Sequence, residues 1–299
     1  MKIWILVCKT DARGYGCNRL TQEAEKMGID VEVMAPEDFD IIVTKDGKKS
    51  IVCKGEYRDL PDCLIPRMGA YTTYFALAVI RHLENQGVIV INPSSSVELA
   101  KDKLATIQIL NSNNIPIPKT MLAKFPIEIK QVEKEFDYPF VLKKVSGTQG
   151  KGIFLIEKKA HMEDITELIQ HSKDYRSDLI IQEFIKPSKG RDIRVIIIGG
   201  KPIGAMLRTA PRGRFKSNFS AGGKVENFEL NKNIEWIAIE STRILGLDVS
   251  GVDILFNGDK YIICEVNSSP GFEGFEKATG INIAENILQY IRARIMQKG

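Results

Sequence analysis

The 299-residue sequence predicts an open α/β layer followed by two α+β lobes. In the first 93 residues, short apolar strand patterns alternate with helical periods, which is typical of a parallel sheet. From Asp192 onward, strand patterns come in pairs around tight turns, which indicates antiparallel sheets. With 43% hydrophobic residues, a chain of this length can bury a sizeable core, so a disordered protein is excluded.

The first domain is predicted over residues 1–93. One hairpin interrupts its alternation, because Asp46-Gly47 separates strand patterns at 41–44 and 50–54 with the residue types of a two-residue turn. The other patterns are strands at 2–8, 31–35, 63–67 and 88–92 and helices at 18–27 and 72–86.

The second and third lobes are predicted over residues 94–185 and 186–299. Asn92-Pro93-Ser94 marks the first boundary, and serine is expected to cap a helix that runs to about Asn111. In the third lobe, helices near 234–245 and 284–297 are expected to cover one face of the sheet. The remaining patterns are strands at 140–144, 152–157, 179–185, 193–198, 203–209, 252–256 and 261–266 and a helix at 162–171.

Composition narrows the class of protein. The formal charge of +4 is spread along the chain without a basic tail, so nucleic-acid binding is not required. The five cysteines are an odd number without a CxxC pair, which favours a reducing cytoplasm. No apolar run approaches the roughly 20 residues of a membrane helix, so no membrane partner is expected.

A glycine-rich segment, 146–152, lies between two strand patterns. Its glycines, including Gly147 and Gly150, favour either a plain hairpin or a lid whose N–H groups face phosphate. Lys143 and Lys144 end the preceding strand with side chains on opposite faces, so one of them, with Lys143 favoured, is expected to reach nucleotide phosphates. The alternative is two solvated lysines.

Two further segments allow alternative interpretations. Glu183 and Phe184 end an apolar strand, where backbone groups could bind a purine, although Phe184 could equally belong to the core. A basic run containing Arg208 and Lys216 favours phosphate over nucleic acid, because few aromatic residues are interleaved with it.

Two neighbouring strands carry the strongest chemical pattern. Glu265 and Asn267 are two residues apart and share one face, and Asp253 on the partner strand can face them. Three oxygen ligands among apolar residues suit Mg²⁺, which takes few protein ligands when it bridges nucleotide phosphates. The alternative, a pair of solvated acids at a sheet edge, fits poorly with the apolar neighbours.

These segments resemble the ATP-grasp ligases, and among them the RimK type, which adds glutamate to the C-terminus of a ribosomal protein. The resemblance spans nearly the whole chain. It is carried by Ile65-Pro66-Arg67-Met68-Gly69, Asp102-Lys103-Leu104, Gly147-Thr148-Gln149-Gly150, Gln182-Glu183-Phe184-Ile185, Asp192-Ile193-Arg194, Ser217-Asn218, Gly251-Val252-Asp253-Ile254, Glu265-Val266-Asn267 and Ser269-Pro270-Gly271.

The resemblance implies an ATP-grasp fold, in which a pre-ATP-grasp domain precedes two α+β lobes that hold ATP between them. The implied site residues are Lys103 and Lys143 near phosphates, Glu183 and Phe184 on the adenine, Asp192 at the ribose, Lys216, Ser217 and Asn218 at the triphosphate, and Asp253, Glu265 and Asn267 on two Mg²⁺ or Mn²⁺ ions. The family often has Arg where Lys216 stands, which weakens a bidentate phosphate contact.

The implied reaction activates a carboxylate as an acyl phosphate and joins it to an amine, with Arg208 holding the oxyanion. L-Glutamate is the expected amine, with Arg67 as one candidate for its side-chain carboxylate, and a protein or peptide C-terminus is the expected acceptor. The near alternative acts on a small cofactor or a carrier-linked precursor. The second class of function is a non-catalytic one, in which the protein is a nucleotide sensor or an RNA-binding module. A homo-oligomer is expected, since the type resembled forms tetramers.

Three substitutions follow from these assignments. Asp253→Asn and Glu265→Gln are expected to remove turnover while thermal melting barely changes. Arg208→Ala is expected to lower turnover while ATP still binds.

Overall fold

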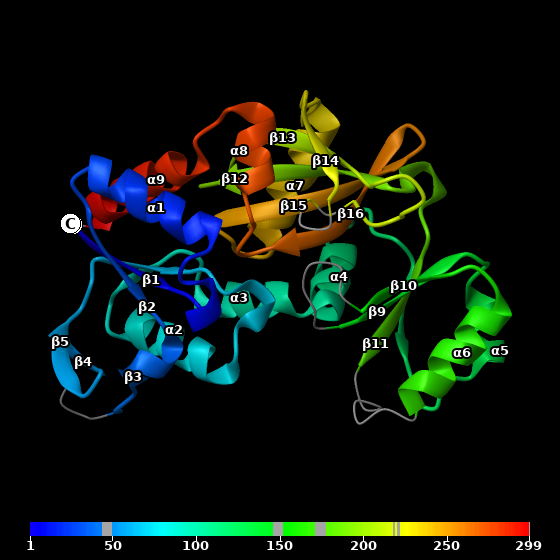
Figure 1. The fold of residues 1–299 in the computed structure, drawn as a ribbon, viewed down its shortest axis with the longest axis horizontal. Helices are drawn as coiled ribbons and strands as arrows, with labels where there is room; N and C mark the ends of the chain where they lie inside the picture. Colours follow the sequence, from blue (N-terminus) through cyan, green and yellow to red (C-terminus); the bar gives the residue numbers. More distant parts are fainter. Residues whose placement is uncertain (44–49, 146–151, 171–177, 218, 220–221, 299) are drawn as a thin grey trace.

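The computed structural model describes residues 1–43, 50–145, 152–170, 178–217, 219 and 222–298. Figure 1 shows the N-terminal layer in blue and cyan at one end, the central lobe in green at the other, and the C-terminal lobe in yellow to red above them. This arrangement confirms an α/β layer followed by two α+β lobes. The boundaries after residues 93 and 185 stay predictions. No helix among the described residues is long and apolar enough to cross a membrane.

The N-terminal sheet is parallel, with strand order β2-β1-β6-β7. Alternate residues of β1 face opposite sides: Ile3 and Ile5 pack toward one helix, whereas Trp4 and Leu6 pack toward another. The strands are β1 (Lys2–Leu6), β2 (Asp30–Met34), β6 (Cys63–Pro66) and β7 (Ile89–Val90), and the two covering helices are α1 (Tyr15–Lys26) and α2 (Tyr74–Asn85).

A small antiparallel sheet follows β2 and corrects the predicted hairpin. Its strands are β3 (Phe39–Asp40), β4 (Ser50–Cys53) and β5 (Glu56–Asp59). The first strand therefore precedes the predicted 41–44, and Asp46-Gly47 lies outside the described residues. β5 was not predicted. Its turn places Lys54 and Gly55 at φ 53° and 81°, and lysine is an unusual residue for the first of these positions.

The long helix predicted from Ser94 is two helices, α3 (Ser94–Lys101) and α4 (Lys103–Ser112). Asp102 separates them, because its Oδ1 accepts from the backbone N–H groups of Leu104 and Ala105 at 2.9 and 3.0 Å. The predicted serine cap is wrong: Pro93 holds the N-cap position, and the Ser94 hydroxyl donates to Glu84.

The central lobe is an antiparallel sheet with strand order β10-β9-β11-β8. Phe140, Leu142 and Ile181 point into a core shared with the two helices. The elements are β8 (Thr120–Ala123), α5 (Ile129–Glu135), β9 (Phe140–Lys144), β10 (Ile153–Ile156), α6 (Lys159–Gln170) and β11 (Leu179–Glu183).

The C-terminal lobe is a five-stranded antiparallel sheet with strand order β14-β13-β12-β15-β16. Both predicted strand pairs are confirmed as β12 with β13 and β15 with β16. The elements are β12 (Arg191–Ile198), β13 (Lys201–Thr209), β14 (Lys224–Phe228), α7 (Lys232–Ile244), β15 (Val249–Asn257), β16 (Lys260–Asn267), α8 (Glu273–Thr279) and α9 (Ile283–Lys298). Short 3-10 helices lie at Lys9–Asp11, Pro36–Asp38, Gly69–Tyr71 and Lys186–Ser188.

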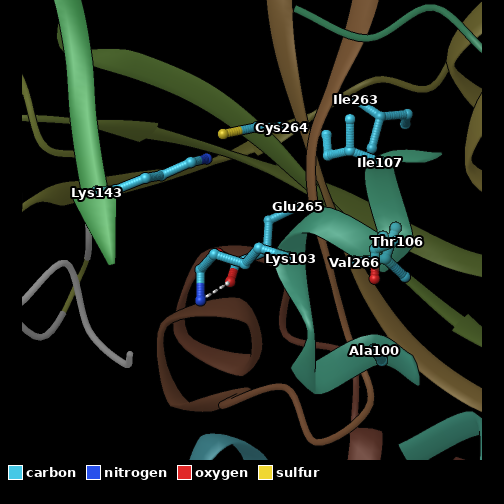
Figure 2. A pocket seen from close by; sticks show the side chains of 9 residues that line it. All are labelled: Ala100, Lys103, Thr106, Ile107, Lys143, Ile263, Cys264, Glu265 and Val266. Atoms are coloured by element: carbon cyan, nitrogen blue, oxygen red, sulfur yellow. Dashed lines mark ion pairs between the residues drawn. The ribbon is translucent and has the colours of Figure 1, made fainter. Parts of the chain in front are cut away.

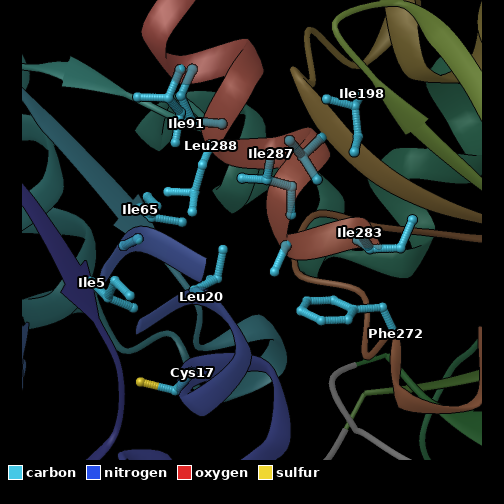
Figure 3. Packing of buried hydrophobic residues seen from close by; sticks show 14 of the residues in the cluster. Ile5, Cys17, Leu20, Ile65, Ile91, Ile198, Phe272, Ile283, Ile287 and Leu288 are labelled. Atoms are coloured by element: carbon cyan, nitrogen blue, oxygen red, sulfur yellow. The ribbon is translucent and has the colours of Figure 1, made fainter. Parts of the chain in front are cut away.

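The two long helices of this lobe do not share a face, contrary to the prediction. α7 packs on Ile193, Val195 and Ile197, whereas α9 packs on the side of Ile196 and Ile198. α9 also contacts α1, so one apolar cluster joins the N-terminal layer to the C-terminal sheet, as Figure 3 shows for Ile5, Leu20 and Ile287. The alternation of β12 makes both faces apolar, so helices are needed on each.

A buried asparagine also joins the N-terminal layer to the C-terminal lobe. The Asn92 Nδ2 donates to the carbonyl oxygens of Val249 and Ser268, and its Oδ1 accepts from the N–H groups of Asp248 and Val249, each at 2.7 Å. All the hydrogen-bonding capacity of this buried amide is therefore used across the domain junction.

Candidate active site

A ladder of charged side chains crosses the C-terminal sheet. The strand register places Asp192 opposite Arg208, Arg194 opposite Asp253, and Asp253 opposite Glu265. Cross-strand partners lie on the same face, so four strands bring these five side chains together. The predicted pairing of Asp253 with the Glu265 strand is therefore present in the structure.

Arg208, on β13 at one edge of these four strands, is only 3% exposed. Its Nε and Nη2 donate to the two carboxylate oxygens of Asp192 at 2.6 and 2.8 Å. Its Nη2 also lies 2.8 Å from Oδ2 of Asp253. Burial alone would lower the pKa of Arg208, but the two carboxylates raise it well above its ordinary value. The guanidinium is thus charged and held in one orientation.

Asp253 is the most constrained of the predicted metal ligands. Arg194 donates to both of its oxygens at 2.7 Å, which adds to the contact from Arg208. Burial would raise the pKa of Asp253, but the two guanidinium groups hold it below its usual value, so the group is ionised. Three donors occupy a carboxylate with about four lone-pair positions, so a metal ion would use the remaining position or displace one arginine contact.

Glu265 and Asn267 are less constrained. The Glu265 side chain is 35% exposed, and its Oε1 lies 3.5 Å from the Lys103 Nζ. The Asn267 Nδ2 donates to the Gly251 carbonyl at 3.3 Å. No group of three His, Cys, Asp or Glu side chains suited to a metal occurs in the described ranges. The predicted set has two acids and an amide, and its metal role stays a prediction.

A narrow pocket lies beside this ladder and brings together two of the predicted phosphate-binding lysines. It is lined by Lys103 from α4, Lys143 from β9, and Cys264 and Glu265 from β16 (Figure 2). Lys143 is only 6% exposed, which contradicts the alternative of a solvated lysine. Burial raises the pKa of Cys264 to about 12, so this thiol is protonated at neutral pH. The pocket therefore offers two ammonium groups beside one carboxylate.

Asp192 and Ser217 form a buried unit beside the pocket. The Ser217 hydroxyl donates to Oδ2 of Asp192 at 2.6 Å, which adds to the two contacts from Arg208. In this structure Asp192 orients Arg208, while its role at the ribose and that of Ser217 at the triphosphate stay predictions.

The other residues that were predicted to bind the nucleotide lie in more exposed segments. Glu183 ends β11 in an exposed position, and Phe184 is half-buried and outside the four clusters that buried hydrophobic side chains form in the described chain. The Lys216 Nζ lies 5.6 Å from the centroid of the Phe215 ring, and burial lowers its pKa. Gly147, Gly150 and Asn218 lie outside the described residues.

Arg194 belongs to this site, although no role was predicted for it from the sequence. It is two residues from Asp192 on the same strand, and period-two alternation was sufficient to place it on the same face. The sequence did not indicate which carboxylate Arg194 contacts, because Asp253 lies 59 residues away in sequence.

Comparisons with known proteins agree with this arrangement. The family model of the RimK PreATP-grasp domain matches residues 1–97, and that of the RimK-like ATP-grasp domain matches residues 100–291. A probable alpha-L-glutamate ligase of Thioalkalivibrio sulfidiphilus is 37% identical over 292 residues, 97% of this chain and 95% of that protein. One of Methanococcoides burtonii is 37% identical over 278 residues, 93% of this chain and 91% of that protein.

Solved structures share the fold at low sequence identity. The ATP-grasp ligase PsnB, complexed with a phosphomimetic variant of its minimal precursor, Mg and ADP, has a TM-score of 0.75 at 18% identity, with 98% of each chain covered. D-alanine–D-alanine ligase from Bacillus anthracis, complexed with ATP, has a TM-score of 0.72 at 17% identity, with both chains fully covered. Both family models and the curated relatives agree across the chain, which therefore belongs to the RimK-like family of ATP-grasp proteins.

Proposed function

We propose that this protein is an ATP-dependent carboxylate–amine ligase that adds L-glutamate to the C-terminal carboxylate of a peptide or protein. The observation that carries the proposal is the buried group of Asp192, Arg208 and Asp253, whose ladder adjoins a pocket lined by Lys103, Lys143 and Glu265. The relatives named probable alpha-L-glutamate ligases support glutamate as the amine. The peptide-bound neighbours PsnB and MdnC support an acceptor of this kind.

Lys103, Lys143 and Lys216 would bind the ATP phosphates. Asp253, Glu265 and Asn267 offer hard oxygen ligands that fit Mg²⁺, and we propose two ions, with Mn²⁺ as an alternative. When bound, Mg²⁺ would neutralise charge on the phosphate oxygens. The negative charge of the triphosphate would also balance the positive charge of the two lysines in the pocket.

The chemistry requires two transfers. In the first, an oxygen of the acceptor carboxylate bonds to the γ-phosphorus as the bond from that phosphorus to the oxygen of ADP breaks. In the second, the glutamate amine attacks the acyl carbon, inorganic phosphate leaves with the electrons of the carbon–oxygen bond, and the amine proton passes to solvent. Arg208 is oriented in advance by Asp192 and Asp253, so it can stabilise the tetrahedral oxyanion without reorganisation.

Glutamate is expected to stimulate phosphate release from ATP more than any other amino acid. The test supplies the purified protein with ATP, Mg²⁺, candidate acceptor peptides and each of the twenty amino acids in turn, and follows phosphate and peptide mass. Strongest release with lysine or alanine would contradict the proposal. A mass gain on a small cofactor with none on any peptide would replace the peptide acceptor by the small-molecule alternative.

Lys216→Ala is expected to raise KM for ATP more than it lowers kcat, because a contact made equally in the ground state and the transition state is lost. Lys232→Ala, which changes an exposed lysine on α7, is the matched control. Steady-state kinetics at varied ATP measure both constants. Unchanged kinetics together with weaker, salt-sensitive RNA binding would favour the nucleic-acid interpretation of this basic run.

We also propose a cytoplasmic location and a homo-oligomeric, tetrameric state. The location is supported by the five cysteines, all of which are free thiols. Sedimentation equilibrium of the purified protein would measure the oligomeric state.

A further inference from the structure

The N-terminal parallel sheet has a topological switch point at β1. The chain runs from β1 to β2 on one side and later returns to β6 on the other side of β1. In open α/β sheets, ligands bind outside the carboxyl ends of the strands at such a point. Arg67 directly follows β6, and α1 begins after β1, so both lie at this end of the sheet.

Arg67 carries a positive charge, and its guanidinium contacts a carbonyl group and an aromatic ring. Its Nη2 donates to the Pro270 carbonyl at 2.8 Å, and its guanidinium lies 5.4 Å from the centroid of the Phe272 ring. In the described part of the chain no carboxylate lies within 4.0 Å of it, whereas the part-buried Arg19 has two such partners and Arg58 has one. Burial lowers the pKa of Arg67 to about 10.

The first turn of α1 adds positive charge beside Arg67. A Cβ on Gly16 would lie 3.0 Å from the Arg67 Nη2, so the guanidinium rests directly against the helix backbone. This turn contains no acidic residue, and Gly14 at the N-cap provides no side-chain cap. The first N–H groups of a helix lack partners within the helix and form its positive end. A guanidinium beside them adds to this positive charge and favours the binding of an anion.

We propose that Arg67, together with the first turn of α1, binds the γ-carboxylate of the incoming glutamate and determines the amino-acid specificity of the ligase. This inference rests on the proposed function. The α-carboxylate is common to all amino acids, so only the γ-carboxylate can distinguish glutamate. The planar guanidinium matches a carboxylate in two parallel hydrogen bonds. Pro270 follows Asn267 by three residues, which connects Arg67 to the end of β16, the strand that carries two of the three predicted metal ligands.

The test compares glutamate with glutamine, which has the same shape without the γ-charge. Arg67→Gln is expected to lower kcat/KM for glutamate by about 30-fold or more, as when one member of a buried charge pair is removed. The rate with glutamine should stay the same, so the preference for glutamate collapses. Arg67→Lys should restore part of that preference. Arg292→Gln, which removes an exposed guanidinium of α9 that donates to the Met27 carbonyl, is the control.

Two outcomes would overturn the assignment. If the rates with glutamate and glutamine fell together, Arg67 would bind the α-carboxylate or act only structurally. If KM for the acceptor rose with amino-acid preference unchanged, it would bind the acceptor carboxylate. No ligation of glutamate by the unaltered protein would instead contradict the proposed function.

Gly16→Ala tests the same site without removing charge. The added methyl group would lie 3.0 Å from the Arg67 Nη2 and 3.4 Å from Cε1 of Phe272, so it displaces the guanidinium. We expect a higher KM for glutamate, a smaller change in kcat and a folded protein, because alanine is favourable within a helix. An unchanged KM for glutamate in this variant would overturn the proposal even if Arg67→Gln failed to fold.

Discussion

Asp253→Asn is expected to remove most ligase turnover and to lower the free energy of unfolding by roughly 3–5 kcal/mol, because a buried ion pair loses one partner. Asp253 is 4% exposed and contacts both Arg194 and Arg208, so the neutral amide leaves the buried Arg208 and the part-buried Arg194 without their shared counter-charge. The sequence alone predicted almost no change in melting. Because Asp253 and Arg208 are both buried, we now expect a clear loss of stability.

Glu265→Gln is the matched comparison, because its side chain is 35% exposed and faces Lys103 at 3.5 Å. An ion pair this exposed contributes about 0–1 kcal/mol, so melting should barely change while turnover is lost. Thermal melting and turnover at saturating Mg²⁺ measure both effects. A near wild-type rate for either variant would contradict the assignment of that residue as a metal ligand. Unchanged melting of Asp253→Asn would show that its ion pairs do not stabilise the fold.

Arg208→Ala is expected to lower turnover by about 100- to 1,000-fold, the usual loss for one donor to an oxyanion. The loss should fall mainly on kcat, because the contact is made to charge that develops in the transition state. Stability should fall as well, since Asp192 and Asp253 are both buried and both lose the same guanidinium. ATP binding, measured by calorimetry on the folded variant, should persist.

Arg208→Lys separates the two effects. Lysine keeps the charge between the carboxylates but lacks the planar fork, so stability should recover more than turnover. Arg243→Ala, which changes an exposed arginine on α7, is the control for loss of a guanidinium at the surface. If Arg208→Ala ligated at the normal rate, Arg208 would be a structural residue only.

Local patterns were enough to predict most strands and several helices. Turn residues and alternation of apolar side chains place β12, β13, β15 and β16 at their positions, because each pattern involves neighbours in sequence. These local patterns fail where a single side chain determines the end of a helix. Asp102 ends α3 and caps α4. The apolar pattern is continuous across this residue and therefore predicted a single helix.

The sequence by itself determined the family, the sheet that carries Asp253 and Glu265, and the residue types available for phosphate and metal. Only the tertiary structure decided which charges meet. Asp192, Arg208 and Asp253 become one buried unit through the register of three strands. The packing of Phe272 and Pro270 against the N-terminal layer places Arg67 where no carboxylate of the described residues lies within 4.0 Å. Alternation specifies the face on which a side chain lies, whereas its partner depends on contacts between residues far apart in sequence.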